Sequence, residues 1–128
     1  MFLLSQRDIG ALLLDPEIKK LYRSLTSTDN GVTANVGSTQ ATGYVVMAAV
    51  TRVTTVAVAG DALTLPRAVA GMSLVVINAA AANSMDVFPA VGDIINALAA
   101  DAALAVAANK TVLLLCAVTG TWNAVVTA

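Results

Sequence analysis

The stretch that decides the expected fold runs from residue 44 to residue 78 and reads YVVMAAVTRVTTVAVAGDALTLPRAVAGMSLVVIN. Apolar and small polar side chains roughly alternate over residues 53–58 and 63–65, as they do in a half-buried strand. Glycine, proline or asparagine interrupts the stretch about every ten residues, which is typical of short strands in a sandwich or barrel. The runs LVVI at 74–77 and VLLLC at 112–116 do not alternate, so we expect a second sheet or another subunit to cover both of their faces.

The same rhythm continues to the end of the chain. It predicts strands over residues 44–50, 52–58, 62–65, 72–78, 84–88, 102–106, 111–118 and 121–127. Predicted turns separate them at Ala59-Gly60-Asp61, Ala70-Gly71, Ala82-Asn83, Gly92-Asp93, Asn109-Lys110 and Thr119-Gly120. The alanine-rich segment at 95–109 has a high helix preference and is a rival helix. Because no face of that segment is polar, strands are favoured there too.

We therefore expect a mainly β fold, namely a small antiparallel β-sandwich or barrel over residues 44–128, preceded by an N-terminal arm over residues 1–43. Within the arm, Asp15-Pro16-Glu17 is a helix start signal. A helix over 16–25 would place Ile18, Leu21, Tyr22 and Leu25 on one face. This face either packs on the protein's own domain or docks on a neighbouring protein. Residues 26–43 are rich in Ser, Thr, Asn and Gly and are predicted to be a linker or extended arm.

The charged side chains are few and unevenly placed. The chain is 58% hydrophobic and 12% charged, with a net charge of −1. Beyond residue 30, the only charged side chains are Arg52, Asp61, Arg67, Asp86, Asp93, Asp101 and Lys110. This apolar content exceeds what a monomer of this size needs, so part of the surface is expected to face a partner. The charge pattern offers no basic footprint for nucleic acid, and aromatic residues are too scarce for base stacking.

The residue inventory argues against an enzyme. The chain has no histidine and a single cysteine, Cys116, in an apolar strand, so a Ser-His or Cys-His nucleophile and a typical zinc site are excluded. Asp61, Asp86, Asp93 and Asp101 are the only candidates for paired carboxylates or a calcium site, and each is expected to cap a turn instead. We predict no catalytic residue, no metal and no cofactor. The apolar runs are also shorter than the roughly 20 residues of a membrane-spanning helix.

Residues 63–126 follow a recognisable order of residues: L-x-L-P, a small-residue turn, a strand ending in Asn, V-x-P-A-x-G-D-x-I-N, and a last strand leading to G-x-W. The matching positions are Leu63, Leu65, Pro66, Gly71, Asn78, Val87, Pro89, Ala90, Gly92, Asp93, Ile95, Asn96, Lys110, Cys116, Gly120 and Trp122. This half of the chain resembles a carboxy-terminal β module that recurs in structural proteins of tailed bacteriophages. Residues 1–43 do not match the module.

The resemblance implies a virion component that assembles as a homotrimer. Because the chain is short, the resemblance favours a capsid decoration or cement protein. The partners of such a protein are other copies of itself and the major capsid protein. It binds no nucleic acid, membrane or small-molecule substrate. Such a protein is made in the host bacterial cytoplasm and ends on the capsid surface. The alternative is a tail, fibre or baseplate module that binds a surface receptor or glycan. Trp122 would be the main aromatic platform of such a module, although a core position is the expected one.

Overall fold

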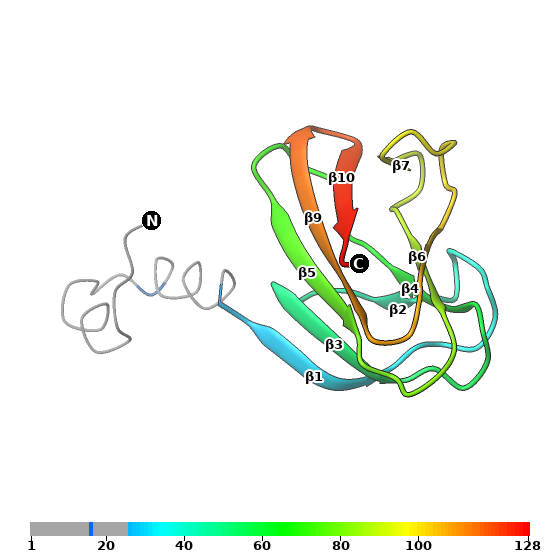
Figure 1. Cartoon of the computed structure of the whole chain (residues 1–128). Coiled ribbons are helices and arrows are strands. Elements are labelled where there is room, and N and C mark those ends of the chain that lie inside the picture. The colour runs from blue at the N-terminus through cyan, green and yellow to red at the C-terminus, as the bar shows by residue number, and fades with distance from the viewer. Residues whose placement is uncertain (1–15, 17–25) are drawn as a thin grey trace.

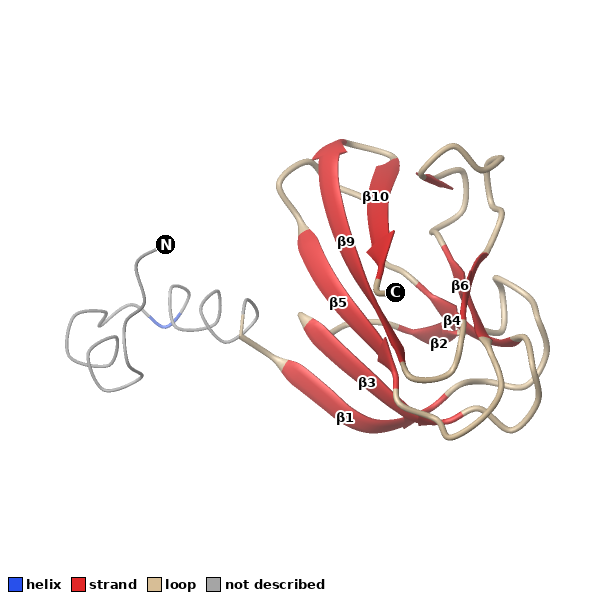
Figure 2. Ribbon diagram, in the orientation of Figure 1, coloured by secondary structure: helices blue, strands red, loops and turns tan. Residues whose placement is uncertain are grey.

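The computed structural model describes residue 16 and residues 26–128 of the chain. The described body consists of strands and connecting loops (Figures 1 and 2). The strands are β1 (Thr28–Thr33), β2 (Tyr44–Val45), β3 (Val50–Thr55), β4 (Asp61–Thr64), β5 (Ser73–Asn78), β6 (Met85–Phe88), β7 (Ile94–Ile95), β8 (Leu104–Val106), β9 (Lys110–Val118) and β10 (Thr121–Val126). They form a six-stranded sheet in the order β1-β3-β5-β9-β10-β7 and a four-stranded sheet in the order β2-β4-β6-β8.

The chain crosses from one sheet to the other after almost every strand. β1, β3 and β5 pair in parallel in the larger sheet, and β2, β4 and β6 pair in parallel in the smaller one. The result is a solenoid-like arrangement in which each coil supplies one strand to each sheet and stacks on the coil before it. The last part of the chain closes this stack differently, because β8 runs antiparallel to β6, and β9 runs antiparallel to β5 and to β10.

The prediction of a mainly β fold is confirmed, whereas its finer form, an antiparallel sandwich or barrel, does not hold. Both sheets are mixed, and their first three strands are parallel. The error has a physical reason. The two-residue alternation that predicts a strand is the same whether the neighbouring strand is parallel or antiparallel, so the pattern does not distinguish a sandwich from stacked coils.

Most of the predicted strands and turns from residue 44 onward agree with the structure. The strand expected over 44–50 is wrong beyond β2 (Tyr44–Val45), the one expected over 52–58 is found at Val50–Thr55, and β7 (Ile94–Ile95) was not predicted. The turn residues Gly60, Gly71, Asn83, Gly92, Asn109 and Gly120 all have positive φ, between 61° and 96°. The rival helix over 95–109 does not form, since this segment contains turns and β8. The prediction of a linker over 26–43 is corrected at β1, which pairs with β3 over its whole length. The β body therefore begins before residue 44.

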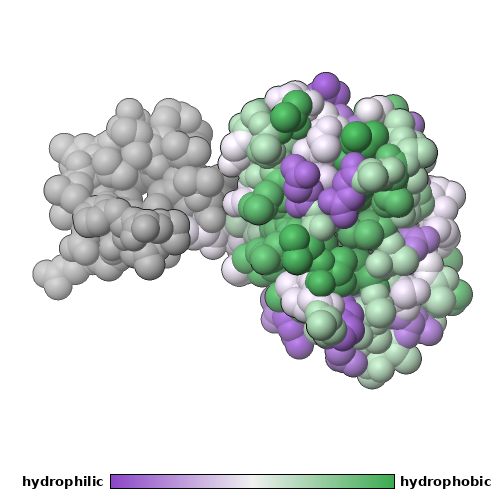
Figure 3. Space-filling model, turned by 45° about the horizontal axis from the view of Figure 1, so that its top comes forward, coloured by the Kyte–Doolittle hydropathy of each residue, from purple (hydrophilic) through white to green (hydrophobic). Residues whose placement is uncertain are grey.

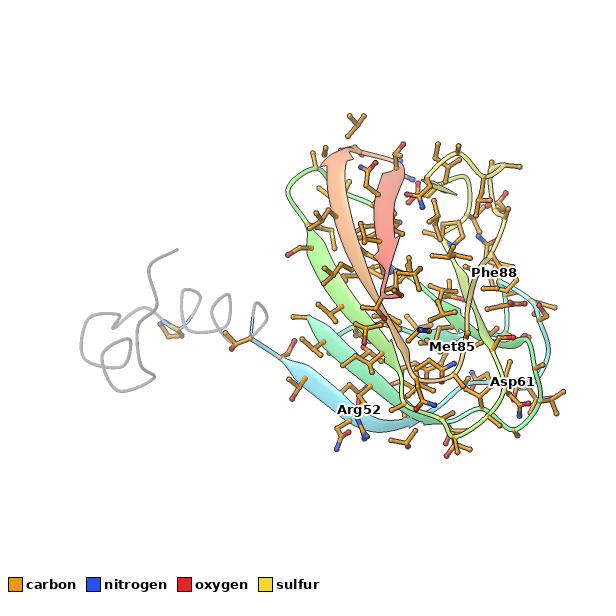
Figure 4. The ribbon with its side chains drawn as sticks, in the orientation of Figure 1. Arg52, Asp61, Met85 and Phe88 are labelled. Carbon is orange, nitrogen blue, oxygen red and sulfur yellow. The ribbon has the colours of Figure 1, made fainter. Side chains whose placement is uncertain are left out.

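The core lies between the two sheets. Val53, Val76 and Leu114 of the larger sheet meet Met85 and Val87 of the smaller sheet in one buried cluster. Trp122 of β10 is fully buried in the same cluster. Figure 4 shows Met85 between the sheets and Arg52 on the outer side of β3. The inner faces of both sheets are thus occupied by the protein's own side chains.

The loop between β1 and β2 lies against the smaller sheet. Asn35 exchanges backbone hydrogen bonds with Ala62 of β4, and Ser38 donates a hydrogen bond to the carboxylate of Asp86 in β6. The approach is close at Gly43, where a Cβ atom would lie 2.9 Å from the carbonyl carbon of Leu63. Only glycine fits there without displacing backbone. The Asn35 bridge extends the smaller sheet in its plane, while Ser38 lies over the outer side of that sheet at Asp86. Among residues 26–128, no loop lies in this way over Leu113, Leu115 or Val125 of the larger sheet, which stay exposed.

Candidate interaction surface

The predicted docking residues Ile18, Leu21, Tyr22 and Leu25 lie outside the described residues, so the arm face stays a prediction. The described body nevertheless has an apolar surface of its own. It is the outer side of the six-stranded sheet, away from the core. We call it the outer aliphatic face and define it by Val50, Val75, Ile77, Leu113, Leu115 and Val125.

Strand register places these side chains next to one another. Val50 pairs with Val75, and Val75 pairs with Leu113 across the next strand boundary. Leu113 in turn pairs with Val125 of β10. Residues that are directly opposite in neighbouring strands share a face and lie about 5 Å apart. Four aliphatic side chains therefore form a continuous row across β3, β5, β9 and β10, with Ile77 and Leu115 beside it.

The alternation along β9 shows why this face is apolar. Val112, Leu114 and Cys116 are buried on the core side of the strand. Leu113 and Leu115, which point the other way, are 46% and 53% exposed, and Val125 on β10 is 61% exposed. A strand with one solvent-exposed side normally carries polar residues on that side. The solvent-exposed side of β9 carries the large aliphatic residues Leu113 and Leu115 instead.

The six residues that define the outer aliphatic face are uncharged, but the exposed Arg52 of β3 lies on the same side of the sheet, directly opposite Ile77. Arg52 donates a 3.1 Å hydrogen bond from Nη1 to the side-chain oxygen of Asn30. Figure 3 shows one side of the body, on which hydrophobic residues, in green, are grouped and lie beside hydrophilic residues, in purple. Such a surface is suited to contacts that depend on removing apolar area from water.

A pocket of about 850 Å³ adjoins this face. It is lined by residues 45–50 and 70–75 together with Pro66. Val50 and Val75 belong both to this pocket and to the outer aliphatic face, so the two are continuous. Met47, at the pocket, is 88% exposed. The lining contains no ionisable side chain, so the pocket offers no side chain for acid-base catalysis and no cationic side chain for an anion.

Each of the four candidate carboxylates accepts one or more hydrogen bonds that fix a loop of the protein. Asp61 caps its own turn, accepting a 3.0 Å hydrogen bond from the Val58 amide. Asp93 accepts one of 2.8 Å from the Ala68 amide, and Asp86 accepts one from Ser38. Asp101 accepts hydrogen bonds from the Gly92 amide, at 2.7 Å, and from the Gln40 side chain, at 3.1 Å. The Gly92 bond, followed by the Gln40 bond, holds the pKa of Asp101 below its ordinary value.

Only Asp61 caps its turn as the sequence predicted, since the partners of the other three come from distant loops. Among residues 26–128, no group of three or more His, Cys, Asp and Glu side chains is placed to hold a metal ion. The arrangement of these carboxylates is that of structural clamps.

No family model, curated protein or solved structure matches the chain. In the described part of the chain, no helix is long and apolar enough to cross a membrane.

Trp122, the only tryptophan, is buried, and its indole nitrogen has no hydrogen-bond partner. A sugar platform needs an exposed aromatic face, so Trp122 cannot stack on a glycan in this fold. Tyr44 and Phe88 are only partly exposed. The predicted core position of Trp122 is confirmed.

The sequence indicated strands with apolar residues on both sides, but it did not show which side would form the outer aliphatic face. The runs LVVI and VLLLC predicted strands that are covered on both sides. In the structure, the core covers one side of β5 and β9, and no other described element covers the opposite side. Which side stays open depends on how β9 pairs with β5 and β10, and this was not readable from the sequence.

Proposed function

We propose that this protein is a structural component of a tailed-bacteriophage virion, and specifically a capsid decoration protein that stabilises the head by bridging capsid subunits. The observation that carries the proposal is the exposed outer aliphatic face, on a body whose four candidate carboxylates each accept hydrogen bonds that hold its own loops. The resemblance of residues 63–126 to a virion β module supports the same function. Both point to adhesion rather than chemistry.

The mechanism is assembly by apolar burial. Copies associate as a homotrimer through the β body, while the predicted arm face of Ile18, Leu21, Tyr22 and Leu25 docks on the major capsid protein. At about 25 cal/mol per Å², burying roughly 300 Å² of apolar surface contributes about 7.5 kcal/mol. An exposed ion pair adds at most about 1 kcal/mol. Apolar contact therefore dominates the interaction.

The test is cosedimentation of the purified full-length protein with phage heads that lack it. The wild-type chain should pellet with the heads in a fixed ratio to the capsid protein. Replacing Leu21 and Leu25 together by Asp should abolish pelleting, because two carboxylates would have to be buried. The matched control places Asp at Lys19 and Arg23, on the opposite side of the predicted helix, and should keep pelleting.

Two results would count against the proposal in different ways. If the wild-type chain stays in the supernatant, it is not a decoration protein of those heads. If the Leu21 and Leu25 variant pellets like the wild type, the head is bound by the β body and not by the arm. The alternative function, a tail or baseplate module that binds a glycan, is not favoured, because the single tryptophan is buried.

A further inference from the structure

We propose that Asn30 is a site of spontaneous covalent modification, where the side-chain amide leaves as ammonia and the backbone closes into a cyclic imide that water reopens. Arg52 assists this step through its hydrogen bond to the side-chain oxygen of Asn30. The reactants are Asn30, the next backbone nitrogen and water, so the chemistry does not depend on the proposed function.

The residue that follows Asn30 distinguishes it from every other asparagine of the chain. The nucleophile in imide formation is the backbone nitrogen of the next residue, and a side chain on that residue crowds its approach. Asn30 is the only asparagine followed by glycine, which has no side chain. A Cβ atom built on Gly31 would have no described atom within 4 Å, so the space around this backbone is open. The local sequence therefore favours ring closure at this asparagine over the others.

The backbone at Gly31 departs from the regular ladder between β1 and β3. Asn30 lies opposite Arg52, and the next paired residue, Val32, lies opposite Val53. Gly31 is therefore the extra residue of a β-bulge, and its φ is +82°. Asn30 and Gly31 are both exposed, on the strand at one edge of the larger sheet. The nitrogen of Gly31 can thus move toward the Asn30 side chain without disturbing a run of paired residues.

The hydrogen bonds of Asn30 differ from those of the asparagines that hold loops. Those residues donate to a backbone carbonyl through the amide nitrogen, which is the atom that would have to leave, and they are Asn35, Asn78, Asn83 and Asn96. Asn30 instead accepts through its oxygen, from Nη1 of Arg52 at 3.1 Å. Figure 4 shows Arg52 beside β1. A guanidinium at this oxygen withdraws electron density from the amide carbon and stabilises the negative charge that develops on the oxygen during attack.

The reaction balances with water as the only added reactant. The nitrogen of Gly31 forms a bond to the side-chain carbonyl carbon of Asn30, and the bond from that carbon to the amide nitrogen breaks. The proton of the Gly31 nitrogen leaves with the amide group as ammonia. Water then adds to one of the two imide carbonyls. Opening at one carbonyl gives aspartate at position 30, and opening at the other gives isoaspartate, in which the main chain passes through the former side chain.

The fold can accommodate either product. A carboxylate at position 30 replaces an amide whose oxygen already lies 3.1 Å from Nη1 of Arg52, so it gains a cation as partner. Isoaspartate adds one carbon to the backbone between residues 30 and 31, where the bulge already departs from the ladder. Each product makes the net charge, which is −1 in the unmodified chain, one unit more negative. The modified protein therefore keeps its fold and differs in charge at the edge strand β1.

The experiment is to incubate the folded full-length chain in mildly alkaline buffer and to follow the peptide that contains residue 30 by liquid chromatography and mass spectrometry. Asn30 should convert to aspartate and isoaspartate at least about tenfold faster than the exposed Asn109 and Asn123, which precede a lysine and an alanine. Asn30→Gln keeps the amide but requires a larger ring, so its amide should stay intact over the same period. Conversion of Asn30 no faster than that of Asn109 and Asn123 would overturn the site.

Two arginine variants test the assistance by Arg52. Arg52→Ala should slow the conversion about fivefold, which is the effect of one modest hydrogen bond in the transition state. The matched control is Arg67→Ala, which removes another exposed arginine, paired with Asp93, and should leave the rate unchanged. In urea, wild type and Arg52→Ala should react alike, because the contact with Asn30 depends on the fold, and circular dichroism checks that both variants fold in buffer. An unchanged rate in folded Arg52→Ala, or equal slowing in Arg67→Ala, would overturn the role of Arg52.

Discussion

The side chain of Asn78, at the end of β5, donates a hydrogen bond of 2.9 Å to the backbone carbonyl of Val106 in β8. One asparagine thereby joins the larger sheet to the smaller one. It also donates to the carbonyl of Asn83 at 3.1 Å and accepts from the Ala80 amide at 3.2 Å. Asn78 is fully buried, so its amide is satisfied entirely by the protein.

Replacing Asn78 by Ala should lower the free energy of unfolding by about 3 kcal/mol, because the buried Val106 carbonyl and its neighbours lose a partner that water cannot replace. Urea denaturation followed by circular dichroism measures the change. Asn123→Ala, at an exposed position of β10, is the control and should stay within about 0.5 kcal/mol of the wild type. Similar stabilities for the two variants would show that Asn78 does not join the sheets.

Asp93 is predicted to act mainly through a backbone amide and not through its ion pair. Its buried carboxylate accepts a 2.8 Å hydrogen bond from Ala68, whereas Arg67 lies 3.7 Å away with a side chain 66% exposed. Asp93→Ala should cost about 2 kcal/mol, since it leaves the buried Ala68 amide without an acceptor. Arg67→Ala should cost less than about 1 kcal/mol. Thermal unfolding of both variants tests this order, and equal costs would contradict it.

Tyr44 should ionise at higher pH than an ordinary tyrosine. Its hydroxyl donates a hydrogen bond to Asp29, and this bond, followed by slight burial and the negative charge of Asp29, raises the pKa above 10.0. In a Tyr22→Phe background, absorbance at 295 nm reports Tyr44 alone. The midpoint should lie above 10.0 and move down when Asp29 is replaced by Asn.

The same shift predicts the sign of a stability change at high pH. The folded protein holds the Tyr44 proton more tightly than the unfolded chain does. The stabilising contribution is therefore complete below pH 10 and is lost as the pH rises through the folded pKa. Asp29→Asn should remove this alkaline loss. An unchanged pH dependence in that variant would contradict the assignment.

Trp122 fluorescence should be blue-shifted and insensitive to added sugars. The indole is fully buried in the core cluster, where neither a glycan nor a quencher reaches it. Acrylamide should quench the emission only after unfolding in urea. A sugar-dependent change in the folded protein would restore the receptor-binding alternative.

Local chemistry predicted most of the β body. The strand expected over 62–65 is found at Asp61–Thr64, and the one expected over 84–88 is found at Met85–Phe88. Turn residues such as Gly60 and Asn83 bound these strands, because they tolerate positive φ. Signals of this kind act within a few residues, so the structures that they favour can be predicted from the sequence.

The pairing of strands that lie far apart in the chain could not be predicted from the sequence. β1 reads TDNGVT, which is polar and contains glycine, and it is a strand because it pairs with β3 at the edge of the sheet. Likewise, VLLLC predicted cover on both sides of a strand, while the open side of β9 emerged only from the pairing of β9 with β5 and β10. The predicted arm face of Ile18, Leu21, Tyr22 and Leu25 stays a prediction.

The edges of the two sheets limit how copies of this protein can aggregate. β1 pairs with β3 through register shifts on both sides of Val32, so its free edge is not a regular template for another strand. The opposite edge, β7, has two residues, and the edges of the smaller sheet, β2 and β8, have two and three. Growth into a fibre by strand addition is therefore disfavoured at every edge. A concentrated solution of this chain should therefore form no filaments built by adding strand to strand.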